Sequence, residues 1–127
     1  MRIHHIGLVC GSEEKADRFY EGLLGLEKTR SFAIGAALSK GLFGFDSGFR
    51  ALMYGKDDVS FEVFVVEEPV AICPRLCHVA IEVENQATLL ERCRKLGIQI
   101  MEVPKEGKTV TMIQDFDANL FELKEKI

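Results

Sequence analysis

The chain repeats its own order of secondary structure, and this repeat limits its possible folds more than any other feature. H-I-G-L-V, which begins at His5, matches H-V-A-I-E, which begins at His78. The dipeptide L-G recurs at Leu24 and Leu96, and S-F-E-V at residues 60–63 matches L-F-E-L at residues 120–123. Self-similarity of this kind indicates two copies of one supersecondary unit. We therefore expect one domain over residues 1–127, with a first module over about 1–67 and a second over about 75–127.

Each half predicts a strand, a helix and three further strands, which is a βαβββ unit of the α+β class. In the first half, the patterns predict a strand at residues 2–10, a helix capped by Ser12 that ends near Leu24, and strands at 27–34, 49–55 and 59–66. In the second half, they predict a strand at residues 76–83, a helix from Asn85 to Leu96, and strands at 98–103, 109–114 and 119–124.

Composition excludes several classes of partner. A net charge of -4, with acidic and basic residues interspersed, gives no footprint for nucleic acid or for an anionic membrane. The first apolar run is too short for a signal peptide, and no later run reaches a membrane-spanning length. We therefore expect a cytoplasmic protein that binds a small molecule or another protein. The four cysteines then fit buried, reduced thiols rather than a zinc site.

The alternation of side chains along the strands places four polar residues on one face of the sheet. Val59, Phe61 and Val63 share the face that we expect under a helix, so Glu62 lies on the opposite face. A carboxylate in so apolar a strand requires a partner, since burying it unpaired is costly. The same reasoning in both halves assigns the uncovered face to His5, Glu62, His78 and Glu122.

Two imidazoles and two carboxylates at positions related by the repeat predict a divalent-metal site. Such donors suit Ni, Zn, Mn, Co or Fe(II), and four protein ligands leave two octahedral positions open. Each residue alone fits a plainer interpretation, a solvated Glu or a His with a structural hydrogen bond. His4 is expected on the helix-covered side, because the repeat aligns His5 with His78.

These residues resemble the vicinal oxygen chelate superfamily, which includes glyoxalase I, methylmalonyl-CoA epimerase, fosfomycin-resistance enzymes, extradiol dioxygenases and bleomycin-binding proteins. The similarity rests on H-H-I-G-L-V, F-Y-E-G-L-L-G-L and D-F-D-A-N-L-F-E-L, and it covers essentially the whole chain. Phe116 and Ala118 replace the Pro and Gly of the family's D-P-D-G-N turn. The resemblance implies two βαβββ modules that form an incomplete barrel around a metal, with the helices outside.

The order His, Glu, His, Glu resembles bacterial glyoxalase I most closely. That resemblance implies a metal-dependent lyase or isomerase, in which Glu122 or Glu62 acts as the base and the metal binds neighbouring oxygens of a small substrate. It also implies a homodimer, with the site within one chain or across two. The alternatives are a metal-free binding or resistance protein of the same fold, an epimerase, or a dioxygenase.

Residues 31–48 are the least regular part of the sequence. Their glycines match neither the Walker spacing nor G-x-G-x-x-G, so they do not predict a phosphate loop. Two interpretations stay open: an apolar lid that places Phe43 and Phe45 over the site, or a surface excursion or dimer contact.

Overall fold

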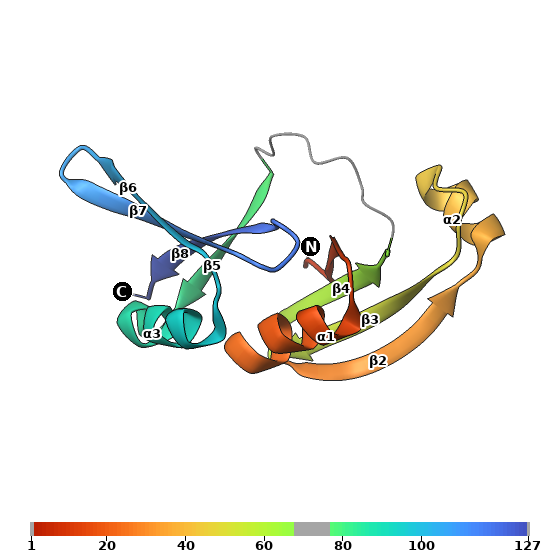
Figure 1. Cartoon of the computed structure of the whole chain (residues 1–127), viewed down its shortest axis with the longest axis horizontal. Helices are drawn as coiled ribbons and strands as arrows, with labels where there is room; N and C mark the ends of the chain where they lie inside the picture. Colours follow the sequence, from red (N-terminus) through yellow and green to blue (C-terminus); the bar gives the residue numbers. More distant parts are fainter. Residues whose placement is uncertain (1, 68–76, 127) are drawn as a thin grey trace. The chain divides into compact units, whose positions relative to one another are not determined.

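Figure 1 shows the computed structural model of the chain, which describes residues 2–67 and 77–126. The chain divides into two compact units, Met1–Val70 and Ala71–Ile127. Each unit contains one four-stranded sheet, and the strand order in the two sheets is the same. The fold class is therefore α+β with two βαβββ modules, as the internal repeat predicts.

The first unit places its strands in the order β1-β4-β3-β2. Strand β1 runs parallel to β4, and the other neighbours are antiparallel. The first and last strands of the module are thus side by side. The elements of this unit are β1 (Ile6–Cys10), α1 (Glu13–Ala16), the π-helix η1 (Asp17–Leu23), β2 (Glu27–Ile34), α2 (Ala36–Phe43), β3 (Phe49–Lys56) and β4 (Val59–Val65).

The first helix begins and packs as its sequence pattern predicts. The Ser12 hydroxyl oxygen accepts a hydrogen bond from the backbone N–H of Lys15 at 3.2 Å, which satisfies one free donor of the first turn. Phe19, Tyr20 and Leu23 are fully buried in η1. Tyr20 stacks on Tyr54 of β3, with 5.2 Å between ring centroids, so this helix covers one face of the sheet. Its wider π form is not visible in the sequence pattern.

The buried face of the first sheet is the one that alternation along β4 predicts. Phe61 and Val63 are 1% and 0% exposed and lie on the helix-covered side. Glu62, between them, therefore points to the opposite face, which we call the open face of this sheet. Ring contacts of Phe61 with Tyr20 complete the aromatic core, with 5.6 Å between centroids.

The second unit repeats the arrangement in the order β5-β8-β7-β6. The side chain of Asn85 accepts a hydrogen bond from the N–H of Thr88 at 3.0 Å and so caps the start of the helix, and Gly97 with φ +72° follows its last residue as the C-cap. Ile113, Phe121 and Leu123 are buried in the core of this unit. Its elements are β5 (His78–Val83), α3 (Gln86–Leu96), β6 (Ile100–Lys105), β7 (Lys108–Gln114) and β8 (Leu120–Glu125).

Several details differ from the sequence prediction. Strand β1 begins at Ile6, so both histidines of the H-H dipeptide precede it. The helix α2 lies inside the segment that the sequence shows as irregular. Strand β6 continues through Pro104, which is tolerated because β6 is at the edge of its sheet and need not donate on its outer side.

The cysteine prediction holds for two of the three described cysteines. Cys10 and Cys93 are buried and form no disulfide among the described residues, whereas Cys77 is exposed, so the expectation of a buried thiol is wrong there. The reason is local: β5 begins at His78, and Cys77 precedes the strand that covers the core. Cys73 lies outside the described residues.

Candidate metal centre

The first unit brings His5 and Glu62 together on its open face. Glu62 projects from the middle of β4, and His5 stands directly before β1, the parallel neighbour of β4. Nε2 of His5 lies 3.9 Å from Oε1 of Glu62, and the side chains of His5 and Glu62 are 37% and 17% exposed. The pair is thus partly sheltered but open to a ligand from solvent.

The second unit brings His78 and Glu122 together in the same way. Nε2 of His78, the first residue of β5, lies 3.4 Å from Oε2 of Glu122 in β8. Oε1 of Glu122 accepts a hydrogen bond from Nζ of Lys124 at 2.7 Å. This hydrogen bond, together with the charges of Lys124 and His78, holds the pKa of Glu122 below its usual range. Both carboxylate oxygens of Glu122 therefore have partners.

The surroundings of the two carboxylates match as the repeat predicts. Glu62 lies between Gly7 of β1 and Met53 of β3 in the sheet register. Glu122 lies between Ala80 of β5 and Met112 of β7. Among the described residues of either unit, no group of three or more His, Cys, Asp or Glu side chains is placed to hold one metal ion. The sequence-predicted ligands are thus found as two equivalent pairs, one in each unit.

The donors of each pair fit a divalent metal ion. Neutral imidazole and carboxylate are ligands that Ni, Zn, Mn and Co accept. Two ligands about 2.1 Å from one ion stand roughly 3 Å apart when the bonds are at right angles. The separations of 3.4 and 3.9 Å are close to that spacing, so a small side-chain adjustment suffices for both donors of a pair to bind one ion.

His4 contacts the first pair, and the sequence did not predict this. It was expected on the helix-covered side, but it precedes β1 and is exposed. Its Nδ1 lies 2.9 Å from Nδ1 of His5, and the rings meet edge to face at 5.1 Å. A hydrogen bond there requires a proton on one Nδ1, and it leaves Nε2 of His5 directed toward Glu62. The H-H dipeptide was the sequence feature that could have indicated this contact between His4 and His5.

The turn before β8 positions Glu122. The buried carboxylate of Asp115 accepts hydrogen bonds from the N–H groups of Asp117 and Asn119, both at 2.9 Å, and from Nδ2 of Asn119 at 2.7 Å. Ala118 adopts φ +66°, a region that favours glycine. The family-like D-F-D-A-N segment is therefore a rigid turn that fixes where β8 starts.

Helix α2, inside the segment 31–48, packs through Phe43 onto the open face of the first sheet. The buried Ser39 hydroxyl donates to the carbonyl of Phe45 at 2.7 Å, and α2 ends at Gly44 with φ +69°. The ring of Phe43 lies 5.4 Å from that of Phe64 in β4, which shares its face with Glu62. Phe43 thus contacts the strand that carries Glu62, whereas a position over the site and motion of the segment stay predictions.

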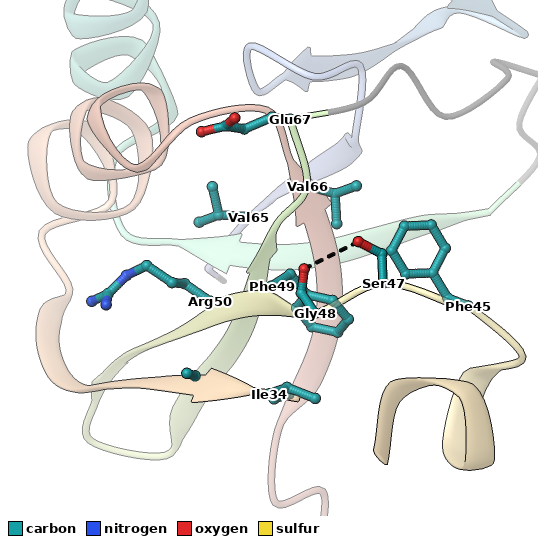
Figure 2. Close-up of a pocket in the computed structure, with 10 residues that line it drawn as sticks. Ile34, Phe45, Ser47, Gly48, Phe49, Arg50, Val65, Val66 and Glu67 are labelled. Carbon is teal, nitrogen blue, oxygen red and sulfur yellow. Dashed lines mark hydrogen bonds between the residues drawn. The ribbon is translucent and has the colours of Figure 1, made fainter. Parts of the chain in front are cut away.

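A cavity of about 500 Å³ opens beside this segment (Figure 2). Its lining includes Phe45 and Phe49, and the Ser47 hydroxyl donates to the Gly48 carbonyl at 3.4 Å. Arg50 and Glu67 supply the charges, but Arg50 already donates to Ser31 and lies 3.8 Å from Glu13. The Arg50 guanidinium is thus already paired with protein groups, so this cavity shows no organised anion site.

The sequence profile of the Glyoxalase/Bleomycin resistance protein/Dioxygenase superfamily matches residues 2–123. The chain belongs to this superfamily. The family resemblance drawn from the motifs is thereby confirmed. No curated protein matches the sequence. The superfamily includes enzymes that act on small molecules, and no helix among the described residues is long and apolar enough to span a membrane.

Solved structures of the superfamily share the fold over nearly the whole chain. A glyoxalase family protein from Bacillus cereus is 18% identical, with a TM-score of 0.75 and coverage of 100% of this chain and 95% of that one. A glyoxalase family protein from Enterococcus faecalis is 20% identical, with a TM-score of 0.72 and coverage of 96% and 95%. A mutant of the fosfomycin resistance protein FosX from Listeria monocytogenes, complexed with Mn(II) and 1S,2S-dihydroxypropylphosphonic acid, is 17% identical, with a TM-score of 0.70 and coverage of 95% and 86%.

Proposed function

We propose that this member of the superfamily is a metal-dependent lyase or isomerase of the glyoxalase I type. The observation that carries the proposal is the pair of His–carboxylate contacts at repeat-equivalent positions, one in each unit. His5, Glu62, His78 and Glu122 would hold one divalent ion, Ni, Zn, Mn, Co or Fe. The two pairs would meet within one chain or across a homodimer.

The residues divide the chemistry between binding and proton transfer. A bound divalent ion supplies Lewis acidity toward two neighbouring oxygens of a small substrate. One carboxylate then takes a proton from a carbon next to those oxygens and returns it to the adjacent carbon, so no proton is gained or lost overall. The imidazoles of His5 and His78 would be the other two ligands of that ion.

The two carboxylates differ in how firmly they are held. The sequence favours Glu122 as the base, because its strand is the closest match to the family motif. The contacts argue for Glu62, since Lys124 and His78 together engage both oxygens of Glu122. A carboxylate that is anchored in this way is better suited to remain a ligand than to move toward a substrate carbon.

Metal uptake is the first test of this function. The purified chain, stripped with a chelator and refilled separately with Ni, Zn, Mn or Co, should bind about one ion per chain. His78→Ala should abolish uptake while far-UV circular dichroism stays unchanged, because His78 contributes nothing to the buried core. Absence of stoichiometric uptake of every metal tried would refute the metal site and leave the metal-free binding protein as the better interpretation.

Glutamine variants separate a ligand from a base. Glu62→Gln and Glu122→Gln each keep an oxygen that can coordinate, but an amide cannot accept a proton at neutral pH. At least one variant should keep most of its metal and lose roughly two to four orders of magnitude in proton exchange or isomerisation of a hemithioacetal. Glu91→Gln, on the exposed side of α3, is the matched control and should change neither quantity. Undiminished turnover with retained metal in both variants would exclude both carboxylates as the base.

A further inference from the structure

A second cavity in the first unit is walled by phenylalanine. Its volume is about 420 Å³, within the range of roughly 300–1,000 Å³ that small-molecule sites occupy. The lining consists of four phenylalanines and three small or apolar residues: Phe43, Phe45, Phe49, Phe64, Gly7, Val9 and Val66. None of these side chains carries a charge.

The cavity adjoins the first His–carboxylate pair through the register of the sheet. Gly7 is the direct β1 partner of Glu62 in β4. Phe64 follows Glu62 by two residues and therefore projects from the same open face. The polar pair and the aromatic wall thus form one continuous strip of that face, within a single unit.

The rings are placed as the walls of a binding pocket rather than as a closed core. Centroids lie 4.9 Å apart for Phe49 and Phe64, and 6.1 Å apart for Phe45 and Phe49. Phe43 remains 54% exposed although it contacts Phe64. Covering water-exposed aromatic surface with an apolar group lowers the free energy of the complex. A charged group there would lose hydration without gaining a partner, which is costly.

We propose that this phenylalanine-lined pocket binds an aromatic, apolar part of the small-molecule substrate. The neighbouring oxygens of that substrate would then lie toward His5 and Glu62, and this second statement rests on the proposed metal-dependent function. The pocket thereby selects ring-bearing substrates over short aliphatic or strongly anionic ones.

Gly7 offers a way to fill the pocket, since an added Cβ there meets no atom of a proposed ligand within 4 Å. A Cβ added at Gly7 would lie 3.7 Å from Cε2 of Phe64, which is ordinary van der Waals contact. Gly7 is not among the residues with positive φ, so a β-branched side chain suits its strand conformation. Val at this position would extend into the space beside Phe64. Ala80 is the equivalent residue of the second unit, as the partner of Glu122, and Ala80→Val is the matched control.

The first experiment tests the pocket alone in the metal-free, full-length protein. Benzyl alcohol is titrated and followed by amide chemical shifts in NMR. Wild type and Ala80→Val should bind it, with shifts at residues 7 and 64, whereas Gly7→Val should bind at least tenfold more weakly. Phe64→Leu, which removes a ring but keeps bulk, should also weaken binding. Equal binding by folded Gly7→Val, or a change of oligomeric mass in place of weaker binding, would overturn the proposal.

The second experiment tests the link to the metal in the metal-loaded protein. Mandelate and lactate present the same neighbouring oxygens, but only mandelate carries a phenyl ring. Mandelate should bind roughly ten- to a hundredfold more tightly, and Gly7→Val should remove this preference without changing metal uptake. Equal affinities in wild type would overturn the assignment of the pocket to the metal-bound substrate. A chain that takes up no metal but still binds benzyl alcohol would refute the metal function and leave the aromatic pocket supported.

Discussion

A network of hydrogen bonds and ion pairs around Asp17 allows the free-energy cost of single substitutions to be predicted. The fully buried Tyr54 donates its hydroxyl to Oδ1 of Asp17 at 2.7 Å. Lys28 lies 2.8 Å from Asp17 and 2.8 Å from Glu13, so one carboxylate serves a phenol and an ammonium together. The perturbation consists of Tyr54→Phe, Asp17→Ala and the double variant.

The expected magnitudes follow from which groups each change leaves unpaired. Tyr54→Phe removes the hydroxyl but leaves Asp17 paired with Lys28, so it should cost about 1–2 kcal/mol, the low end for a hydrogen bond to a charged group. Asp17→Ala leaves the buried Tyr54 hydroxyl without its acceptor, and it should cost about 2–4 kcal/mol. We discount the Lys28 ion pair in this sum, because its side chain is 23% exposed and is partly screened by solvent.

Urea unfolding followed by far-UV circular dichroism measures these costs. The double variant should be less destabilised than the sum of the single variants, with a coupling energy of about 1–2 kcal/mol. Asp58→Ala is the control: its carboxylate pairs with Arg2 at 2.9 Å, but its side chain is 89% exposed, so its loss should cost less than about 0.5 kcal/mol. A coupling energy below about 0.5 kcal/mol, or an equal cost for Asp17→Ala and Asp58→Ala, would refute the reasoning.

Three further predictions concern pH and the turn before β8. Burial and the hydrogen bond to Asp17 raise the pKa of Tyr54 above its unfolded value of about 10. The protonated phenol therefore contributes its full stabilisation of the folded state below about pH 10, and this contribution is lost as the pH rises further. Unfolding measured along an alkaline titration should show wild type losing its higher free energy of unfolding relative to Tyr54→Phe only above that pH. Ala118→Gly should raise the melting temperature by a few degrees, since φ +66° costs alanine about 1 kcal/mol, and a lower melting temperature would contradict this. Asp115→Ala removes three hydrogen bonds to a buried carboxylate and should cost about 3–5 kcal/mol in urea unfolding; a cost below about 1 kcal/mol would show that the turn does not depend on Asp115.

The sheet faces were predictable because the signal for them is local. Side chains alternate along a strand, so the burial of Phe61 and Val63 assigns Glu62 to the other face without knowledge of any neighbour. The same holds for Phe121 and Leu123 on either side of Glu122. The repeat supports each assignment independently, since the same pattern occurs in two separate segments.

The elements that the sequence did not predict depend on tertiary contacts. Helix α2 is flanked by Gly35 and Gly44 and contains Gly41, so its intrinsic helix propensity is low. The buried Ser39, bonded to the carbonyl of Phe45, helps to hold it in place.

The candidate site was predicted as a set of four residues, but its pairing was not. Pairing of His5 with Glu62 follows from the parallel contact of β1 with β4, which joins the first and last strands of the module. Strand order is a property of the whole unit, and alternation along single strands carries no information about it. The contacts of His4 with His5 and of Lys124 with Glu122, by contrast, join residues one and two positions apart and do not depend on strand order.

The two halves keep the same proposed ligands and differ two residues later, and this difference gives the proposed site its asymmetry. Phe64 stands two residues after Glu62 and faces an uncharged aromatic cavity. Lys124 stands two residues after Glu122 and donates to its carboxylate. A duplicated module that had kept both positions identical would hold two equivalent carboxylates, neither better placed to move than the other. Glu122 is anchored by the ammonium of Lys124, whereas Glu62 lies beside the proposed pocket for an apolar ring. In the proposed site, Glu122 is therefore better suited to bind the metal and Glu62 to transfer the proton.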